Sequence, residues 1–110
     1  MCEGQSVLWH VVLISFHANA SGSAMQEVYD RYQTLAEECG GAGEGILHFQ
    51  VNHNLDQRKG VHLVEIAVFR SNEDLQRFRM HPRHVELTDI LKSIADWQVG
   101  DSMFSSIKFD

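Results

Sequence analysis

The sequence contains little proline, few cysteines and no long apolar segment. One proline in 110 residues, together with an apolar fraction of 44%, is typical of a compact globular chain and not of a disordered one. The longest apolar stretch, residues 7–16, is interrupted by His10 and Ser15 and is too short to span a bilayer. We therefore expect a single domain over residues 1–110, with no membrane partner.

Basic residues are also scarce. Nine lysines and arginines against fifteen acidic residues give a formal net charge of −6, so the chain has no basic footprint for nucleic acid. Residues 1–4 lack the basic start of a secretion signal. Two cysteines, Cys2 and Cys39, are too few for a disulfide framework or a thiolate metal site. These absences predict a cytoplasmic protein with reduced thiols and no nucleic-acid partner.

Hydrophobic periodicity predicts four strands and three helices. The apolar residues between Met25 and Cys39 recur at steps of three and four, which indicates a helix that ends at Gly40. Ser23 and Gln26 have the spacing of a capping box at its start. The predicted strands are residues 7–16, 46–53, 61–69 and 97–104, and the other predicted helices are residues 71–80 and 82–94.

This order of elements favours an α+β fold, the ferredoxin-like βαββαβ sandwich, with a four-stranded antiparallel sheet and helices on one face. Two of the strands, residues 7–16 and 61–69, are apolar on both faces, so the second face of the sheet also needs a cover. A second copy of the same sheet is the simplest cover. We therefore expect a homodimer in which two sheets close a dimeric α+β barrel.

The segment His81-Pro82-Arg83-His84 places two imidazoles around the only proline. Proline moves the preceding residue out of the α region and suits a first helical turn, so one helix ends near Met80 and the next begins at Pro82. His84 then lies in a first turn, where the helix dipole disfavours the imidazolium. A neutral ring there can act as a base near pH 7. The alternative interpretation is that the corner only joins two helices.

Further segments accompany this corner: His10 in the first strand, residues 49–55 (FQVNHNL), His62 near the third strand, and residues 96–101 (DWQVGD). Together with the corner, they resemble the stress-responsive A/B barrel (Dabb) family over about residues 8–104. The resemblance implies a dimeric α+β barrel. Most members of this family have no established reaction and are tied loosely to stress.

One plant member of that family is a polyketide cyclase that closes an aromatic ring by aldol condensation without a cofactor. The resemblance implies that His84 is the catalytic base and that His10 and His62 belong to the same catalytic site. That enzyme has a tyrosine at the position of Phe78, and the family often has a lysine where this chain has Ser15. The corresponding hydroxyl and charge are therefore missing at these positions.

The strand order suggests how the three histidines would meet. We expect the first and third strands to be parallel neighbours, which would place His10 and His62 about one strand spacing, roughly 5 Å, apart. With His84 above them, three imidazoles would converge in a largely apolar pocket, where burial lowers their pKa values. Such a pocket suits proton abstraction beside a carbonyl, or a lyase step, on a small hydrophobic molecule. The predicted substrate-binding residues are Val12, Val64, Phe78, His81, Leu87 and Leu91.

Other interpretations remain open at this point. Three neutral histidines can hold zinc, but the sequence has no HxH or HExxH spacing, and we predict no metal. No flavin, nicotinamide or phosphate motif is present, so we predict no cofactor. The chain could instead be a stress-related binding or structural dimer whose histidines are core residues. The arginines near the corner, Arg70, Arg77, Arg79 and Arg83, either attract an anionic ligand or form a solvated helix face.

Overall fold

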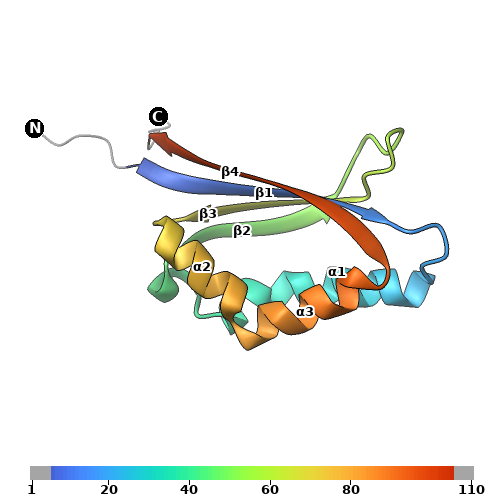
Figure 1. The fold of residues 1–110 in the computed structure, drawn as a ribbon, viewed down its shortest axis with the longest axis horizontal. Helices are drawn as coiled ribbons and strands as arrows, with labels where there is room; N and C mark the ends of the chain where they lie inside the picture. Colours follow the sequence, from blue (N-terminus) through green and yellow to red (C-terminus); the bar gives the residue numbers. More distant parts are fainter. Residues whose placement is uncertain (1–5, 106–110) are drawn as a thin grey trace, which may run out of the picture.

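The computed structural model describes residues 6–105, so Cys2 and the other residues of the N-terminal segment considered above lie outside the described residues. Three helices cover one face of a four-stranded sheet, and the other face is bare in this chain (Figure 1). Among the described residues, no helix is long and apolar enough to cross a membrane. The elements are β1 (Ser6–Phe16), α1 (Gly22–Glu38), the short 3₁₀ helix η1 (Gly41–Glu44), β2 (Ile46–His53), β3 (Leu63–Phe69), α2 (Asn72–Met80), α3 (Pro82–Lys92) and β4 (Ala95–Ser105).

The sheet has the strand order β2-β3-β1-β4, and every neighbouring pair is antiparallel, which confirms the ferredoxin-like α+β fold. The expectation that β1 and β3 are parallel is wrong. The helix α1 carries the chain back across the sheet, so that β2 runs in the same direction as β1. The hairpin that follows β2 then reverses the chain, and β3 runs against β1.

The core lies between the helices and one face of the sheet. Side chains alternate along β1, and Leu8, Val12 and Ile14 are buried under the helices. Opposite them, α1 contributes Val28 and Leu35 from its apolar stripe. The outer side of the sheet differs, because Trp9 is 39% exposed and Ile66 is 37% exposed within this chain. Within one copy of the chain, these strands are therefore buried on the inner face of the sheet only.

The helix starts follow local hydrogen bonds. The capping box at Ser23 is wrong, because Gly22 is already helical and the Ser21 hydroxyl accepts a hydrogen bond from the backbone N–H of Ala24 at 3.1 Å. At α2, Ser71 caps the helix by accepting from the N–H of Asp74 at 3.2 Å. The N-terminal capping residue is thus shifted by two positions in α1, while α2 begins where the sequence predicts.

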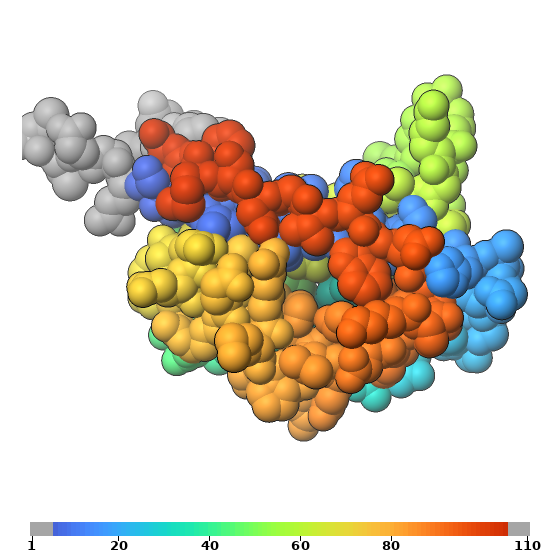
Figure 2. Space-filling view, viewed as in Figure 1, coloured from blue at the N-terminus to red at the C-terminus, as the bar shows by residue number. Residues whose placement is uncertain are grey.

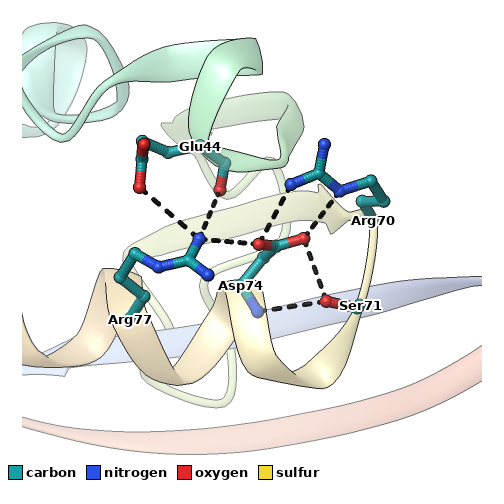
Figure 3. Close-up of polar contacts among 5 residues, drawn as sticks. All are labelled: Glu44, Arg70, Ser71, Asp74 and Arg77. Atoms are coloured by element: carbon teal, nitrogen blue, oxygen red, sulfur yellow. Dashed lines mark hydrogen bonds and ion pairs between the residues drawn. The ribbon is translucent and has the colours of Figure 1, made fainter.

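A buried carboxylate fixes the start of α2 (Figure 3). Arg70 Nε donates to Asp74 Oδ2 at 2.9 Å, and Arg77 Nη1 donates to Asp74 Oδ1 at 2.7 Å. Hydrogen bonding by Arg70, then by Arg77 and Ser71, lowers the pKa of Asp74 to about 2 although burial opposes the shift. The cluster ties α2 to the end of β3, and α2 in turn leads into the corner that carries His84.

Candidate functional site

The His-Pro corner has the predicted conformation. Helix α2 ends at Met80, His81 is extended with φ −64° and ψ 137°, and Pro82 begins α3. The His81 Nδ1 accepts a hydrogen bond from the backbone N–H of Arg83 at 3.1 Å. His81 therefore caps α3, and it lines a hollow beside Phe78 and Cys39 that is separate from the cavity beside His84.

A cavity of about 330 Å³ lies beside His84, between the helices and the inner face of the sheet. Figure 2 shows the surface hollowed between β4, in red, and the helices α2 and α3, in yellow to orange. Polar and apolar side chains both line the cavity, so it is less apolar than the sequence suggested. Its wall includes His10, Val12, Tyr32, Glu65, Arg79, His84, Thr88, Leu91, Trp97 and Val99.

His84 lies in the first turn of α3 and is half-buried. Its ring packs edge-on against Phe78, with 4.7 Å between ring centroids, and its Nδ1 lies 3.5 Å from the Thr88 hydroxyl. Burial lowers the pKa of His84 to about 4, and the backbone hydrogen bond of Arg79 only partly opposes this effect. His84 is therefore a neutral imidazole at neutral pH.

This shift predicts how stability depends on pH. The folded pKa of His84, about 4, lies below the ordinary value of 6.5, so the unfolded chain binds more protons between these two values. His84 therefore causes the free energy of unfolding to fall as the pH is lowered from 6.5 towards 4, by about 2 kcal/mol after allowance for partial exposure. Urea unfolding at pH 7 and pH 4.5 measures this loss.

The variant His84→Asn serves as the reference for this measurement, because it has no imidazole to protonate. It should lose about 2 kcal/mol less than the wild type between the two pH values. His10 shifts the other way, since its raised pKa adds stability below pH 6.5 that is lost above its folded pKa. The wild type and His84→Asn both contain His10, so its contribution cancels when their losses of unfolding free energy are compared. Equal losses in the two proteins would contradict the assigned protonation of His84.

His10 is buried on β1 between two carboxylates. Its Nδ1 lies 2.5 Å from Asp101 Oδ1 on β4, and its Nε2 lies 3.3 Å from Glu65 Oε2 on β3. A neutral imidazole has one N–H and one lone pair, whereas an imidazolium has an N–H for each carboxylate. Glu65 Oε2 makes no aligned hydrogen bond to any described residue, so its pairing with His10 is mainly electrostatic.

The protonation of His10 differs from the expectation. Burial alone would lower its pKa, but the hydrogen bond to Asp101 and the negative charges of Glu65 and Asp101 outweigh burial and raise the pKa above its ordinary value of 6.5. The predicted lowering is therefore wrong for His10, because its neighbours are charged. The pKa values of the two histidines of the cavity are thus shifted in opposite directions.

His62 does not join these two histidines. The antiparallel register pairs His10 with Ala67, whereas His62 precedes β3 at the opposite end of β1. There the His62 Nδ1 accepts a hydrogen bond from the backbone N–H of Phe16 at 3.0 Å. It lines a separate hollow beside Tyr29, so the predicted meeting of three imidazoles is reduced to two.

Only some of the predicted substrate-binding residues line the cavity beside His84. Val12 and Leu91 line the cavity, but Val64 lies on the outer face of the sheet, because side chains alternate along β3. Leu87 is buried in the core. Phe78 is buried there as well, and its ring packs on those of Phe69 and His84.

The sequence prediction missed Glu65, Asp101 and Tyr32. Glu65 is the one charge in the apolar strand β3 and shares its face with Leu63 and Ala67, a pattern that indicates a buried carboxyl. Asp101 belongs to the segment 96–101, but no local pattern shows that it reaches His10. Tyr32 is part of the apolar stripe of α1, a pattern that by itself indicates only a core position, yet it lines the cavity.

The arginines near the corner are paired with carboxylates. Arg79 Nη2 donates to Asp101 Oδ2 at 2.8 Å, and Arg83 Nη1 donates to Glu86 Oε1 at 3.3 Å. Arg70 and Arg77 both bind Asp74. This pairing favours a solvated helix face over an anion-binding cluster. No group of three or more His, Cys, Asp or Glu side chains within residues 6–105 is arranged to hold a metal ion.

A family model described as the stress responsive A/B barrel domain matches residues 8–104 of this sequence. The chain belongs to this family. Comparison with curated protein sequences gives no significant match. The assignment agrees with the ferredoxin-like sheet and the helix corner described above.

Solved structures similar to this A/B barrel domain share its fold at low sequence identity. A dimeric ferredoxin-like protein of unknown function from Bacteroides fragilis has a TM-score of 0.75 at 17% identity, over 89% of this chain and 96% of its own. The hydroxynitrile lyase from Passiflora edulis has a TM-score of 0.73 at 14% identity, over 93% and 96%. The cofactor-independent oxygenase SnoaB from Streptomyces nogalater has a TM-score of 0.66 at 15% identity, over 96% of each chain.

Proposed function

We propose that this A/B barrel domain protein is a cofactor-independent acid–base enzyme of the lyase or cyclase type that acts on a small organic molecule. The observation that carries the proposal is that one cavity is lined by two histidines whose surroundings shift their pKa values in opposite directions, His10 between two carboxylates and His84 against the Phe78 ring. When two histidines in one site have pKa values shifted apart, the one with the lower pKa can act as the base, and the one with the higher pKa keeps its proton as the charged partner. His84 is then the base, and His10 is the charged partner.

The chemistry follows from the groups around the cavity. His84 takes a proton from a carbon beside a carbonyl, or from a hydroxyl whose loss begins a bond cleavage. Both ring nitrogens of His10 face carboxylates, so a hydrogen bond to negative charge that develops on the substrate comes from another group in the wall. Burial, and then the charge of Glu65, raises the pKa of Tyr32, so its phenol stays protonated and is available to donate a hydrogen bond to an oxyanion.

Tyr32 can replace the tyrosine that the plant cyclase of this family has at the position of Phe78. The Phe78 ring has no hydroxyl and packs into the core, so it supplies no hydrogen bond to a ligand. Tyr32 of α1 is the tyrosine at the wall of the cavity. We propose that Tyr32 supplies the phenolic hydroxyl at this site.

The walls suit a ligand with an apolar part. Val12, Leu91 and Trp97 form apolar surface beside the two histidines. A cavity of about 330 Å³ lies within the range of roughly 300–1,000 Å³ that is usual for small-molecule sites. The hydroxynitrile lyase and the cofactor-independent oxygenase that share this fold give further support.

Turnover of defined compounds tests the proposal. Purified protein is incubated with uncharged aldol products, cyanohydrins and linear polyketone analogues, and products are followed by mass spectrometry. Incubation of simple ketones in deuterated water adds a direct test, because a working base exchanges the hydrogens beside a carbonyl. Exchange or cleavage that exceeds the rate with the His84→Asn variant supports the proposal. Equal rates in both proteins for every compound would contradict it.

A non-catalytic binding protein is the second candidate. It is favoured by the low pKa of His84, about 4, because a base this weak holds a transferred proton poorly at neutral pH. This candidate predicts that compounds bind in the cavity and leave unchanged. The same incubations separate the two functions, since only an enzyme converts or exchanges the bound compound.

We also propose that the protein works as a homodimer that pairs the bare faces of two sheets. That face carries the exposed Trp9 and Ile66, and Phe104 packs against Trp9 with 6.3 Å between ring centroids. The similar proteins described as dimeric support this assembly. Apolar surface of this kind is stabilised when a second copy covers it.

Placing a charge at the centre of this face should separate the two copies. Ile66 lies between Val11 of β1 and Gln50 of β2, so Ile66→Asp would bury a carboxylate in the paired sheets. We expect the dissociation constant of the dimer to rise about a hundredfold, which corresponds to about 3 kcal/mol. Sedimentation equilibrium measures it. Leu55→Asp, at a position 101% exposed in a loop, is the matched control and should remain dimeric. A dimeric Ile66→Asp variant would place the interface elsewhere.

A further inference from the structure

We propose that Glu65 sets the charge of the cavity, and that Glu65 thereby makes the cavity selective for an uncharged ligand. This inference rests on the proposed small-molecule site, but it does not require that catalysis takes place there. It assigns the charge class of the ligand and names a specificity-determining residue that no sequence pattern for catalysis singled out.

Glu65 is an unusual residue for its position. It lies in the middle of β3 and is 3% exposed, and its neighbours on the same face, Leu63 and Ala67, are apolar. A carboxylate in such surroundings is unfavourable unless a positive charge accompanies it. The imidazole of His10 on the neighbouring strand is the partner, since its Nε2 is 3.3 Å from Glu65 Oε2.

Charged and titratable groups face His10 from several elements of the fold. Asp101 contacts the other ring nitrogen from β4, and Asp101 is itself bound by Arg79 of α2. Tyr32 of α1 and His84 of α3 line the same cavity, and neither carries a charge at neutral pH, given the directions of their pKa shifts. Glu65 and Asp101 are therefore the groups that hold a proton on each nitrogen of His10.

With His10 charged, the charges around the cavity balance. Three positive groups are matched by three negative groups, and each positive group has a negative neighbour. The positive groups are His10, Arg79 and Lys92, and the negative groups are Glu65, Asp89 and Asp101. A charged ligand would lose its hydration on entering and would find no unmatched charge in return. An uncharged ligand does not incur this loss, so the balance selects for it.

Glu65 is the member of this set that can be changed with least effect on shape. Glutamine has the size of glutamate but no charge, so Glu65→Gln leaves the cavity with one unmatched positive charge as long as Asp101 keeps His10 protonated. The variant should therefore accept an anion that the wild type excludes. Glu37→Gln is the matched control, because Glu37 is exposed on α1 and does not line the cavity.

Three probes of one size and different charge test the selectivity: benzyl alcohol, benzoate and benzylamine. Their binding is followed at pH 5.5 by shifts of the amide signals of cavity residues. We expect the wild type and Glu37→Gln to bind benzyl alcohol at least tenfold more tightly than either ion. In Glu65→Gln the affinity for benzoate should rise about tenfold, with the affinity for benzyl alcohol changed less than threefold. If benzyl alcohol does not bind the wild type, or if an ion binds more tightly, the inference is overturned.

The protonation of His10 gives a second measurement that needs no ligand and no variant. Nitrogen-15 spectra of the wild-type imidazoles at pH 6 should show a proton on both nitrogens of His10 and on one nitrogen of His84. In Glu65→Gln the pKa of His10 should fall by about one unit, a tenfold change in its proton dissociation constant. A neutral His10 in the wild type, or an unchanged pKa in the variant, would overturn the inference even if Glu65→Gln binds no probe.

These measurements separate this inference from the proposed function. If the probes and the His10 spectra behave as expected but no compound is turned over, the charge assignment stands and the enzyme proposal fails. If turnover depends on His84 but benzoate binds the wild type as well as benzyl alcohol, the enzyme proposal stands and the role of Glu65 fails.

Discussion

Replacing His84 by asparagine should reduce the rate of any turnover by about a hundredfold to ten-thousandfold, because general acid–base groups contribute that much. Asparagine retains a polar side chain of similar bulk but has no nitrogen that accepts a proton at neutral pH. The effect should fall on kcat and much less on KM, since the cavity walls formed by Val12 and Leu91 are unchanged. Single-turnover and steady-state kinetics on a compound identified as above measure it.

The control for this variant is His17→Asn. His17 is a partly exposed histidine whose Nε2 lies 3.2 Å from Asp96 Oδ2, and a surface pair of this kind contributes little to stability. Its loss should leave both turnover and the unfolding midpoint nearly unchanged. If His84→Asn unfolds at a much lower urea concentration at pH 7, His84 is chiefly a packing residue beside Phe78. Full activity in a folded His84→Asn protein would remove His84 from the mechanism.

Replacing Gly45 by alanine should lower the free energy of unfolding by about 3 kcal/mol. Gly45 has φ +84°, a left-handed conformation that costs a residue with a Cβ about 1–2 kcal/mol. A Cβ at Gly45 would also overlap the carboxyl carbon of Asp74, and crowding of a packed site adds about 1–3 kcal/mol. Asp74 cannot move away easily, because Arg70 and Arg77 hold its two oxygens (Figure 3). Urea unfolding at pH 7 measures the change.

Gly60→Ala separates the two causes. Gly60 has nearly the same φ, +87°, but a Cβ there meets no atom within 4 Å. This variant should therefore show only the backbone cost, about 1–2 kcal/mol. Equal losses in the two variants would mean that the Asp74 cluster yields without cost. A larger loss in Gly45→Ala than in Gly60→Ala would show that the Asp74 cluster, which holds the start of α2, resists displacement.

Local features of the sequence predicted the elements well. The apolar stripe of α1 and the alternation along the strands arise from residues close in sequence, so their periods can be read directly. The corner at Pro82 follows from the covalent geometry of one residue. The cap of α1 was misplaced because Ser21 and Ser23 are equally suited to that role, and only the helical conformation of Gly22 decides between them.

Features that depend on distant contacts were predicted less well. The direction of β3 relative to β1 results from a crossover and a hairpin, and reading β1 and β3 as parallel placed His62 beside His10. The hydrogen bond between His10 and Asp101 joins residues 91 positions apart, and nothing near either residue indicates it. The apolar segments around His10 suggested a lowered pKa, whereas the folded chain brings two carboxylates to its ring.

The sequence by itself thus determined the order of strands and helices and the corner that presents His84, because both follow from neighbouring residues and their spacing, while the family was indicated by resemblance. The tertiary structure decided which histidines share a cavity and in which direction the pKa of each is shifted. The physical reason is that protonation depends on burial and on partner charges, and both arise only when β1, β3, β4 and α3 pack together.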